Sequence, residues 1–136
     1  LLEREQSARE VAEAAEQRFK DLVNGLDHAI FWEANAKTLQ FSFVSQSSQM
    51  LLGYPSDNWL QKSDFWVNLI HPDEREEILQ YRRQQIKQGL DHEIQYRCIG
   101  ANDQIVWLRD KAYLVRDDDG TILKIRGLLL DITDAK

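Results

Sequence analysis

The chain has 136 residues, of which 43% are hydrophobic, and its formal net charge at pH 7 is −6. A chain of this size can bury the core of one domain, and its acidic balance argues against a nucleic-acid partner, because phosphate contacts need a basic surface. No apolar run approaches the roughly 20 residues that a bilayer-spanning helix needs, so we expect no membrane contact from this chain. Cys98 is the only cysteine, which excludes an intramolecular disulfide and a cysteine-based metal site. A lone cysteine favours a reducing, cytoplasmic location and leaves open a membrane tether elsewhere in a parent protein.

Residues 1–26 predict one long amphipathic helix, because they lack proline and are rich in Ala, Glu, Gln and Arg. Apolar side chains recur at steps of three or four along one face. This stripe comprises Ala8, Val11, Ala15, Phe19, Leu22 and Leu26. A narrow stripe either packs on its own domain or pairs with a second copy. We expect the first half to pair and the second half to dock, although a helix that only links domains stays open for residues 1–14. The expected dimerisation residues are Val11, Ala15, Phe19 and Leu22.

Residues 29–44 predict two strands, the first over 29–34 and the second over 39–44, with a turn between them. Their aromatic and aliphatic content is typical of a half-buried sheet. In the second strand, simple alternation places Phe41 and Phe43 on the same face.

Short helices are predicted over residues 45–69. The run Ser-Gln-Ser-Ser at 45–48 offers an N-cap for a first helix, and Gly53 closes it. A break at Tyr54-Pro55-Ser56 precedes another short turn. The segment SDFWVNLI then predicts a brief amphipathic helix, and its expected buried residues are Phe65, Trp66 and Leu69.

A longer helix is predicted over HPDEREEILQYRRQQIKQG, residues 71–89. Pro72 fits the first helical turn, the acidic residues after it complement the positive end of the helix dipole, and Gly89 ends the helix. The expected inner side carries Ile78, either Tyr81 or Arg82, and Ile86.

The last third of the chain predicts three strands joined by turns at 101–103 and 117–120. In the first of them, alternation puts Ile94, Tyr96 and Cys98 on one face. The order is therefore helix, two strands, several short helices and three strands. Elements that are segregated in this way predict an α+β domain with an antiparallel sheet and helices on one face.

Four segments in this order resemble the PAS sensory domain: RFKDLVNGLDHAIFWEAN, FSFVSQSSQMLLGYP, FWVNLIHPDERE and the terminal stretch from QYRCIG to DITDAK. The resemblance covers about residues 19–136 and implies a five-stranded antiparallel sheet with short helices on one face. It divides the chain into an amphipathic or dimerisation helix at 1–26, a PAS domain at 27–133, and the start of a truncated connecting helix at 134–136.

The end of the chain, GLLLDITDAK, is explained by this resemblance. In PAS domains the Asp-Ile-Thr end of the last strand commonly leads into a connecting helix and an output module. Asp131 can accept hydrogen bonds from nearby donors, and Thr133 or Asp134 can cap the next helix. We therefore expect Asp131 and Thr133 to relay a signal, with a capped tail that transmits nothing as the alternative. Because the sequence starts at Leu1 instead of Met and stops within a helix start, we expect an excised piece of a longer protein.

A PAS fold can enclose a small cavity, but bulky aromatic residues at strand and helix spacing are more often core. The expected lining comprises Trp32, Phe43, Met50, Phe65, Trp66, Leu69, Ile78, Tyr96, Trp107 and Leu129. Arg97 or Arg109 would be the partner of an organic acid. We expect no cofactor, although an unknown small organic ligand or a non-covalent flavin stays open.

Two cofactors of the family are disfavoured residue by residue. The covalent-flavin branch needs a cysteine in an Asn-Cys-Arg-Phe-Leu-Gln-like motif before the long helix, where this chain has SDFWVNLIHPDE. Haem-binding members usually supply a histidine from the long helix, and there is none between Glu74 and Gln88. The three histidines also lack metal-ligand spacing, so no metal site is expected.

We find no catalytic constellation. The acidic residues at 73–77 are explained by the helix dipole, the serines at 45–48 lack a nucleophile elbow, and there is no glycine-rich phosphate loop. The first hypothesis is thus a sensory or regulatory PAS module whose output domain is missing, either a histidine kinase or a cyclic-di-GMP cyclase or phosphodiesterase. The second is a ligand-free PAS dimerisation module for protein–protein interaction, and a small stand-alone enzyme has no supporting motif.

Overall fold

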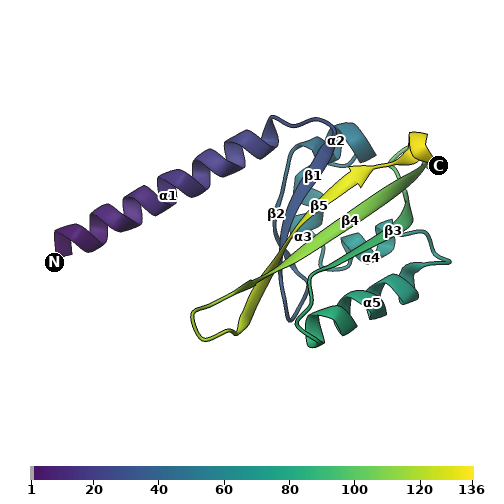
Figure 1. Ribbon diagram of the computed structural model, residues 1–136. Helices are drawn as coiled ribbons and strands as arrows, with labels where there is room; N and C mark the ends of the chain where they lie inside the picture. The colour runs from purple at the N-terminus through teal and green to yellow at the C-terminus, as the bar shows by residue number, and fades with distance from the viewer. Residues whose placement is uncertain (1) are drawn as a thin grey trace.

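The computed structural model describes the backbone of residues 2–136 and the side chains from residue 7 onward (Figure 1). Its elements are α1 (Leu2–Asn24), β1 (Ala29–Asn35), β2 (Phe41–Val44), α2 (Ser47–Leu52), α3 (Ser56–Gln61), α4 (Phe65–Leu69), α5 (Arg75–Lys87), β3 (His92–Ile99), β4 (Ile105–Arg116), β5 (Ile122–Asp131) and the 3-10 helix η1 (Thr133–Ala135). This order confirms the predicted α+β arrangement. Leu1, which the predicted N-terminal helix included, lies outside the described residues.

The five strands form one antiparallel sheet in the order β2-β1-β5-β4-β3. The last strand, β5, therefore lies in the middle of the sheet, between β1 and β4. Helices α2–α5 form the connection between β2 and β3 and cover one face of the sheet (Figure 1). The core lies between that face and these helices. The strand that ends the domain is thus in direct contact with both halves of the sheet.

A β-bulge in β2 changes which face its aromatic residues occupy. Glu33 pairs with Phe43 and Ala34 pairs with Phe41, so Ser42 is an extra residue in β2. The Ser42 hydroxyl donates to the Glu33 carboxylate at 2.9 Å. As a result, Phe41 is buried and Phe43 is only half-buried. The prediction that the two rings share a face was wrong, because a bulge breaks the period of two.

Helix α5 begins at Arg75, three residues later than Pro72. A turn precedes it, in which the backbone N–H of Glu74 donates to the carbonyl of His71 at 2.9 Å. The inner side of the helix carries Ile78 and Arg82, which are both buried. Of the two alternatives at 81 and 82, the arginine is therefore the deeply buried one.

Helix α1 extends away from the sheet and meets it only near its end (Figure 1). Val11 and Leu22 are each 68% exposed, whereas Val23 is buried. The Phe19 ring packs edge-on against Phe31, with ring centroids 6.4 Å apart. The expected docking is thus limited to the last turns of the helix. Within the described residues, no helix is both long enough and apolar enough to span a bilayer.

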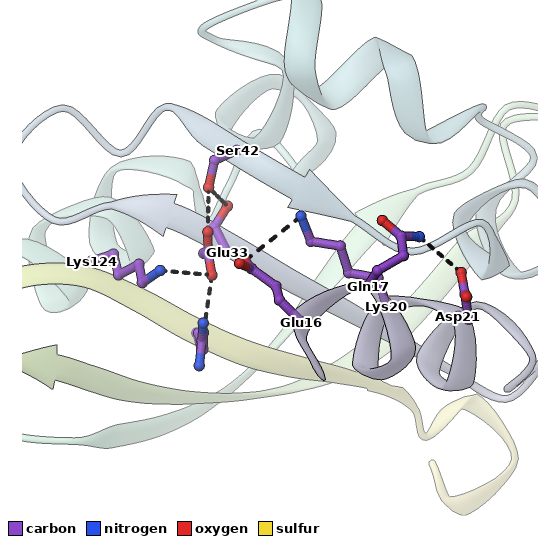
Figure 2. Close-up of polar contacts among 8 residues, drawn as sticks. Glu16, Gln17, Lys20, Asp21, Glu33, Ser42 and Lys124 are labelled. Carbon is purple, nitrogen blue, oxygen red and sulfur yellow. Dashed lines mark hydrogen bonds and ion pairs between the residues drawn. The ribbon is translucent and has the colours of Figure 1, made fainter. Parts of the chain in front are cut away.

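The end of α1 lies beside a charged cluster on the outer face of the sheet (Figure 2). Lys20 pairs with Glu16 within the helix, and its ammonium lies 5.4 Å from the centroid of the Phe43 ring. On β1, Glu33 accepts from Arg126 at 2.9 Å. Burial raises the pKa of Glu33, but the hydrogen bonds from Arg126 and Ser42 and the charge of Lys124 outweigh this and lower the pKa overall. The end of α1 therefore lies in a polar, charged setting.

The serines at 45–48 are buried links between elements and do not cap α2. No side chain caps α2. Ser45 Oγ accepts from the Phe31 N–H at 3.0 Å, Ser47 Oγ donates to the Ala29 carbonyl, and Ser48 Oγ accepts from the indole N–H of Trp59 at 2.8 Å. The predicted N-cap was therefore wrong. The predicted stop at Gly53 is confirmed, because this residue takes the left-handed conformation with φ of +82°.

Candidate functional site

Six of the ten residues expected to line a cavity are buried between the sheet and the helices. They are Trp32, Trp66, Leu69, Ile78, Tyr96 and Leu129. Phe65 is partly buried and packs against this core.

Phe43, Met50 and Trp107 lie outside the interior. Phe43 turns outward because of the bulge in β2. Met50 is 68% exposed, because α2 turns it to solvent while Leu52 is buried. Trp107 is on the outer face of β4, because its neighbours Val106 and Leu108 occupy the inner face. These three positions were wrong as interior lining.

The centre of the interior is an arginine held between two tryptophans. Arg82 of α5 is only 3% exposed. Its guanidinium carbon lies 4.8 Å from the ring centroid of Trp32 on β1 and 4.7 Å from that of Trp66 on α4. A guanidinium over an indole ring is stabilised by cation–π attraction. An arginine thus fills the space between the sheet and the helices.

Asp110 of β4 neutralises this buried arginine. Its Oδ2 atom lies 2.8 Å from Nη2 of Arg82, and Asp110 is fully buried. The Tyr96 hydroxyl also donates to Oδ2, at 2.7 Å, and accepts from the indole N–H of Trp66 at 3.0 Å. Burial and the charge of Asp110 together raise the pKa of Tyr96 well above its usual range. Tyr96 therefore serves as a neutral hydrogen-bond donor.

His92 completes the network from the edge strand β3. Its Nε2 accepts from Nε of Arg82 at 3.2 Å, and its Nδ1 donates to the carbonyl of Leu90 at 3.1 Å. Both contacts are satisfied by the neutral imidazole with its proton on Nδ1. Burial lowers the pKa of His92, and the charge of Arg82 acts in the same direction. The histidine is therefore held in its neutral form.

The sequence prediction missed the Arg82–Asp110 pair, although a signal for it was present. In QIVWLRDKAYLV, alternation puts Asp110 on the same face as Val106, Leu108 and Ala112. A charged residue in register with three apolar ones indicates a buried partner, because an unpaired buried charge is costly.

Arg97 and Arg109 lie on the outer face of the sheet, away from the interior. Arg97 Nε donates to Glu74 at 2.9 Å. Arg109 donates to Glu93 on the neighbouring strand, and this hydrogen bond lowers the pKa of Glu93. As partners for an acid bound in the interior, the two arginines are wrongly placed.

The end of β5 is fastened to β4 by a small set of hydrogen bonds, which we call the C-terminal clasp (Asp131, Ile132, Thr133 and Trp107). Asp131 Oδ1 accepts from the N–H of Thr133 at 2.9 Å and from its hydroxyl at 2.6 Å. Thr133 Oγ1 accepts from the N–H of Trp107 at 3.1 Å, and the N–H of Ile132 donates to the Trp107 carbonyl at 2.9 Å. No side chain caps η1, so Thr133 binds β4 in place of the expected helix cap.

Two further features limit the chemistry of the described residues. Cys98 is buried, and burial, reinforced by the charge of Asp131, raises the pKa of its thiol to about 12. Such a thiol is a poor nucleophile near neutral pH. Within residues 7–136, no group of three or more His, Cys, Asp or Glu side chains is placed to hold a metal ion.

Comparisons with known proteins place the fold in a family. A sequence model of the PAS fold matches residues 41–129. The sensor protein FixL of Bradyrhizobium diazoefficiens is 28% identical over 105 residues, which are 77% of this chain and 20% of that protein. The two-component sensor PprA of Pseudomonas aeruginosa is 29% identical over 126 residues, 92% of this chain and 13% of that protein. The chain thus spans a fifth or less of the length of these curated relatives.

Solved structures agree with this assignment. The N-terminal domain of a diguanylate cyclase with PAS/PAC sensor from Marinobacter aquaeolei superposes with a TM-score of 0.73 at 32% identity, covering 79% of this chain and 97% of that one. A sensory box histidine kinase/response regulator from Burkholderia thailandensis has a TM-score of 0.64 at 23% identity, covering 87% and 86%, and supports the fold alone. The chain belongs to the PAS fold family, and it is similar to the sensor proteins FixL and PprA and to the sensor-containing N-terminal domain of a diguanylate cyclase.

Proposed function

We propose that this chain is a sensory or regulatory module that relays a signal to a C-terminal output domain, either a histidine kinase or a cyclic-di-GMP cyclase or phosphodiesterase. The observation that carries the proposal is the C-terminal clasp. It fastens the point where the chain leaves the sheet to Trp107 of β4, through Thr133 and Ile132. A change in the position of β4 would therefore move the start of whatever follows residue 136.

Strand β4 connects the interior to the clasp. Asp110 points inward from this strand and binds Arg82, and Trp107, three residues earlier, holds Thr133. Because a strand is a stiff, hydrogen-bonded element, a shift of Asp110 is expected to displace Trp107 as well. The same strand pairs with β5, where Asp110 lies opposite Leu129. This supports a relay from the packed interior to the domain exit.

The proposal is tested in a chimera in which this chain replaces the PAS domain of a related diguanylate cyclase. Thr133→Val removes the hydroxyl that joins Asp131 to Trp107 and keeps the side-chain volume. We expect a several-fold change in the rate of cyclic-di-GMP formation, with little change in the Tm of the isolated chain. The matched control is Thr121→Val in the exposed β4–β5 turn, which should leave the rate unaltered. Equal rates for both variants and the unmodified chimera would overturn the relay through the clasp.

The second candidate function is a ligand-free dimerisation module. The observation that favours it is the exposed apolar stripe of α1, where Val11 and Leu22 are each 68% exposed and Phe19 is 48% exposed. Exposed apolar rows on a long helix commonly pair with a second copy. We propose a homodimer through this stripe, acting together with the relay and without catalytic activity of the chain itself.

We also propose that the domain is cytoplasmic and that it works without a cofactor. The absence of a cofactor is supported by the side-chain filling between Trp32 and Trp66, where the Arg82 guanidinium takes the space that a small organic ligand or a non-covalent flavin would need. Native mass spectrometry of the purified chain, combined with an absorbance spectrum of the same sample, is expected to show a dimer at the bare chain mass. Additional bound mass with visible absorbance would contradict the proposal.

A further inference from the structure

The Arg82 side chain occupies the interior in the way a bound ligand would. It enters from α5 and ends between elements that are distant in sequence: β1, α4, β4 and the edge strand β3. We propose that the recess between Trp32, Trp66 and Asp110 is a recognition site for planar cations of the guanidinium type, and that Arg82 fills it as a built-in ligand. This occupancy does not depend on which output domain follows.

The shape of the recess selects a flat cation. The guanidinium carbon lies over both indole rings, at 4.8 Å from the centroid of Trp32 and 4.7 Å from that of Trp66. A guanidinium is planar and presents both faces to aromatic rings, whereas an ammonium is a compact and strongly hydrated charge. Two polar groups meet the edge of the guanidinium. Asp110 Oδ2 lies 2.8 Å from Nη2 in an ion pair whose geometry gives no hydrogen bond, and His92 Nε2 accepts a hydrogen bond from Nε at 3.2 Å. Two indole rings and polar groups at the edge together suit a guanidinium better than an ammonium.

The recess has hydrogen-bonding capacity that Arg82 does not use. Asp110 Oδ1 has no hydrogen-bond partner among the described residues, although Asp110 is fully buried. Oδ2 carries both of the contacts of the carboxylate, from Arg82 and from Tyr96. A guanidinium that is free of the α5 tether could place two parallel N–H groups on the two oxygens, which is the preferred geometry of this pair. A free ligand is therefore chemically better suited to the carboxylate than the tethered one.

Because Arg82 is part of the chain, the unmodified domain should not take up an external cation at this place. Removal of the side chain beyond Cβ should expose the recess, with Trp32, Trp66 and Asp110 still positioned by their own elements. Ethylguanidinium replaces the atoms that Arg82→Ala removes. It is therefore the matched probe, and ethylammonium is the control with the same charge but without the plane.

The experiment measures Tm of the purified chain by thermal scanning. Arg82→Ala should lower Tm by about 10 °C or more, because it leaves the Asp110 carboxylate buried without its charge partner. Millimolar ethylguanidinium, far below denaturing concentrations, should recover a large part of that loss and should change the tryptophan fluorescence. Ethylammonium should not do so, and neither compound should raise Tm of the unmodified chain. Arg83→Ala, which alters the exposed neighbour on the same helix, should show neither the loss nor the recovery.

The specificity of the recovery is checked with Asp110→Asn in the Arg82→Ala background, which should abolish the effect of ethylguanidinium. Equal recovery by ethylammonium, or recovery that persists after Asp110→Asn, would overturn the site. If Arg82→Ala does not fold, the unmodified chain still tests the occupancy. NMR should find the Arg82 Nε–H shifted upfield by the ring currents and slow to exchange with water. Exchange as fast as that of Arg83 would show that the recess is not filled by Arg82 and would overturn the proposal.

Discussion

Gly127 on β5 lies directly opposite Trp32 on β1. A Cβ atom at this position would lie 2.1 Å from Cε2 and Cζ2 of the Trp32 ring, far inside van der Waals contact. The ring has little freedom to move, because it also packs on the Arg82 guanidinium and edge-to-face with Phe41. We expect Gly127→Ala to lower the free energy of unfolding by about 1–3 kcal/mol, as over-packing of a core does. Urea unfolding measures the difference.

The matched control is Gly25→Ala, at the end of α1. There the nearest atom to an added Cβ is the Leu22 carbonyl oxygen at 3.4 Å, an ordinary contact. This substitution should have little effect on the free energy of unfolding. If the two alanine variants were equally stable, the close approach of Trp32 to β5 would be incorrect, and with it the position of the arginine recess.

His92 predicts a pH dependence of stability. Its pKa is lowered in the folded chain, first by burial, relative to an unfolded value of about 6.5. The unfolded chain therefore binds the proton first as the pH falls. The contribution of neutral His92 is fully present above about pH 6.5 and is lost as the pH falls below it toward the folded pKa. We expect the free energy of unfolding to decrease between about pH 7 and pH 5, as measured by urea unfolding at each pH.

Substitution separates this histidine from the others. His92→Gln should flatten the pH dependence over this range, because the group that titrates is gone. His28→Gln, at an exposed position just before β1, should retain the slope of the unmodified chain. A slope that survives in His92→Gln would assign the pH dependence to another group.

At the scale of the element, α1 presents a stripe with no cover in the described chain. Val11 is 68% exposed, and the first half of α1 extends away from the sheet (Figure 1). Deleting residues 1–18 should shift the chain from dimer toward monomer in sedimentation velocity. Val11→Gln should raise the dissociation constant of the dimer about ten-fold, because each copy loses the two methyl groups of Val11 from the interface. The control for Val11→Gln is Glu13→Gln, on the opposite side of the helix, which should leave the dimer unchanged. A dimer that persists after the deletion of residues 1–18 would contradict pairing through α1.

The elements differ in how far they could be predicted from sequence. In β3, strict alternation correctly separated Tyr96 and Cys98 from the outward residues, because the strand has no irregularity. In β2, the same rule failed at Ser42, where an inserted residue reverses the alternation. Nothing in four residues of strand distinguishes a bulged pairing from a regular one, since the register depends on the partner strand. Helix α5 was found from its composition, but its start was set by a turn around His71.

The site was harder to predict than the fold for a related reason. Sequence patterns separate apolar from polar positions, and the centre of this interior is a polar network. The sequence of α5 alone does not show that Arg82 is on the inner side; the contacts with Trp32 and Trp66 do. Its counter-charge, Asp110, is 28 positions away in a different element, so the pair becomes visible only when both elements are assembled.

At the scale of the whole molecule, the sheet has two unequal faces. The inner face packs against Trp66 of α4 and the arginine network beneath α2–α5. The outer face carries Trp107, which is half-buried and has Arg97 and Lys136 at 5.7 and 5.0 Å from its ring centroid. If Trp107 were core, as its sequence position suggested, its truncation would cost about 3–5 kcal/mol. The structure instead predicts that cost for Trp66→Ala.

Trp107→Ala should therefore lower the free energy of unfolding by only about 1 kcal/mol, because the half-buried Trp107 ring has less buried area to lose than the Trp66 ring. Urea unfolding of the two variants at several chain concentrations measures this contrast. Hydrogen exchange should in addition show faster exchange of the Ile132 and Thr133 amides in Trp107→Ala, since the lost ring no longer contacts Lys136 beside the C-terminal clasp. Equal losses for both variants at every concentration would contradict the outward placement of Trp107. A loss for Trp107→Ala that grows with chain concentration would instead mean that a second copy covers the outer face, which would extend the dimer contact from α1 onto the sheet.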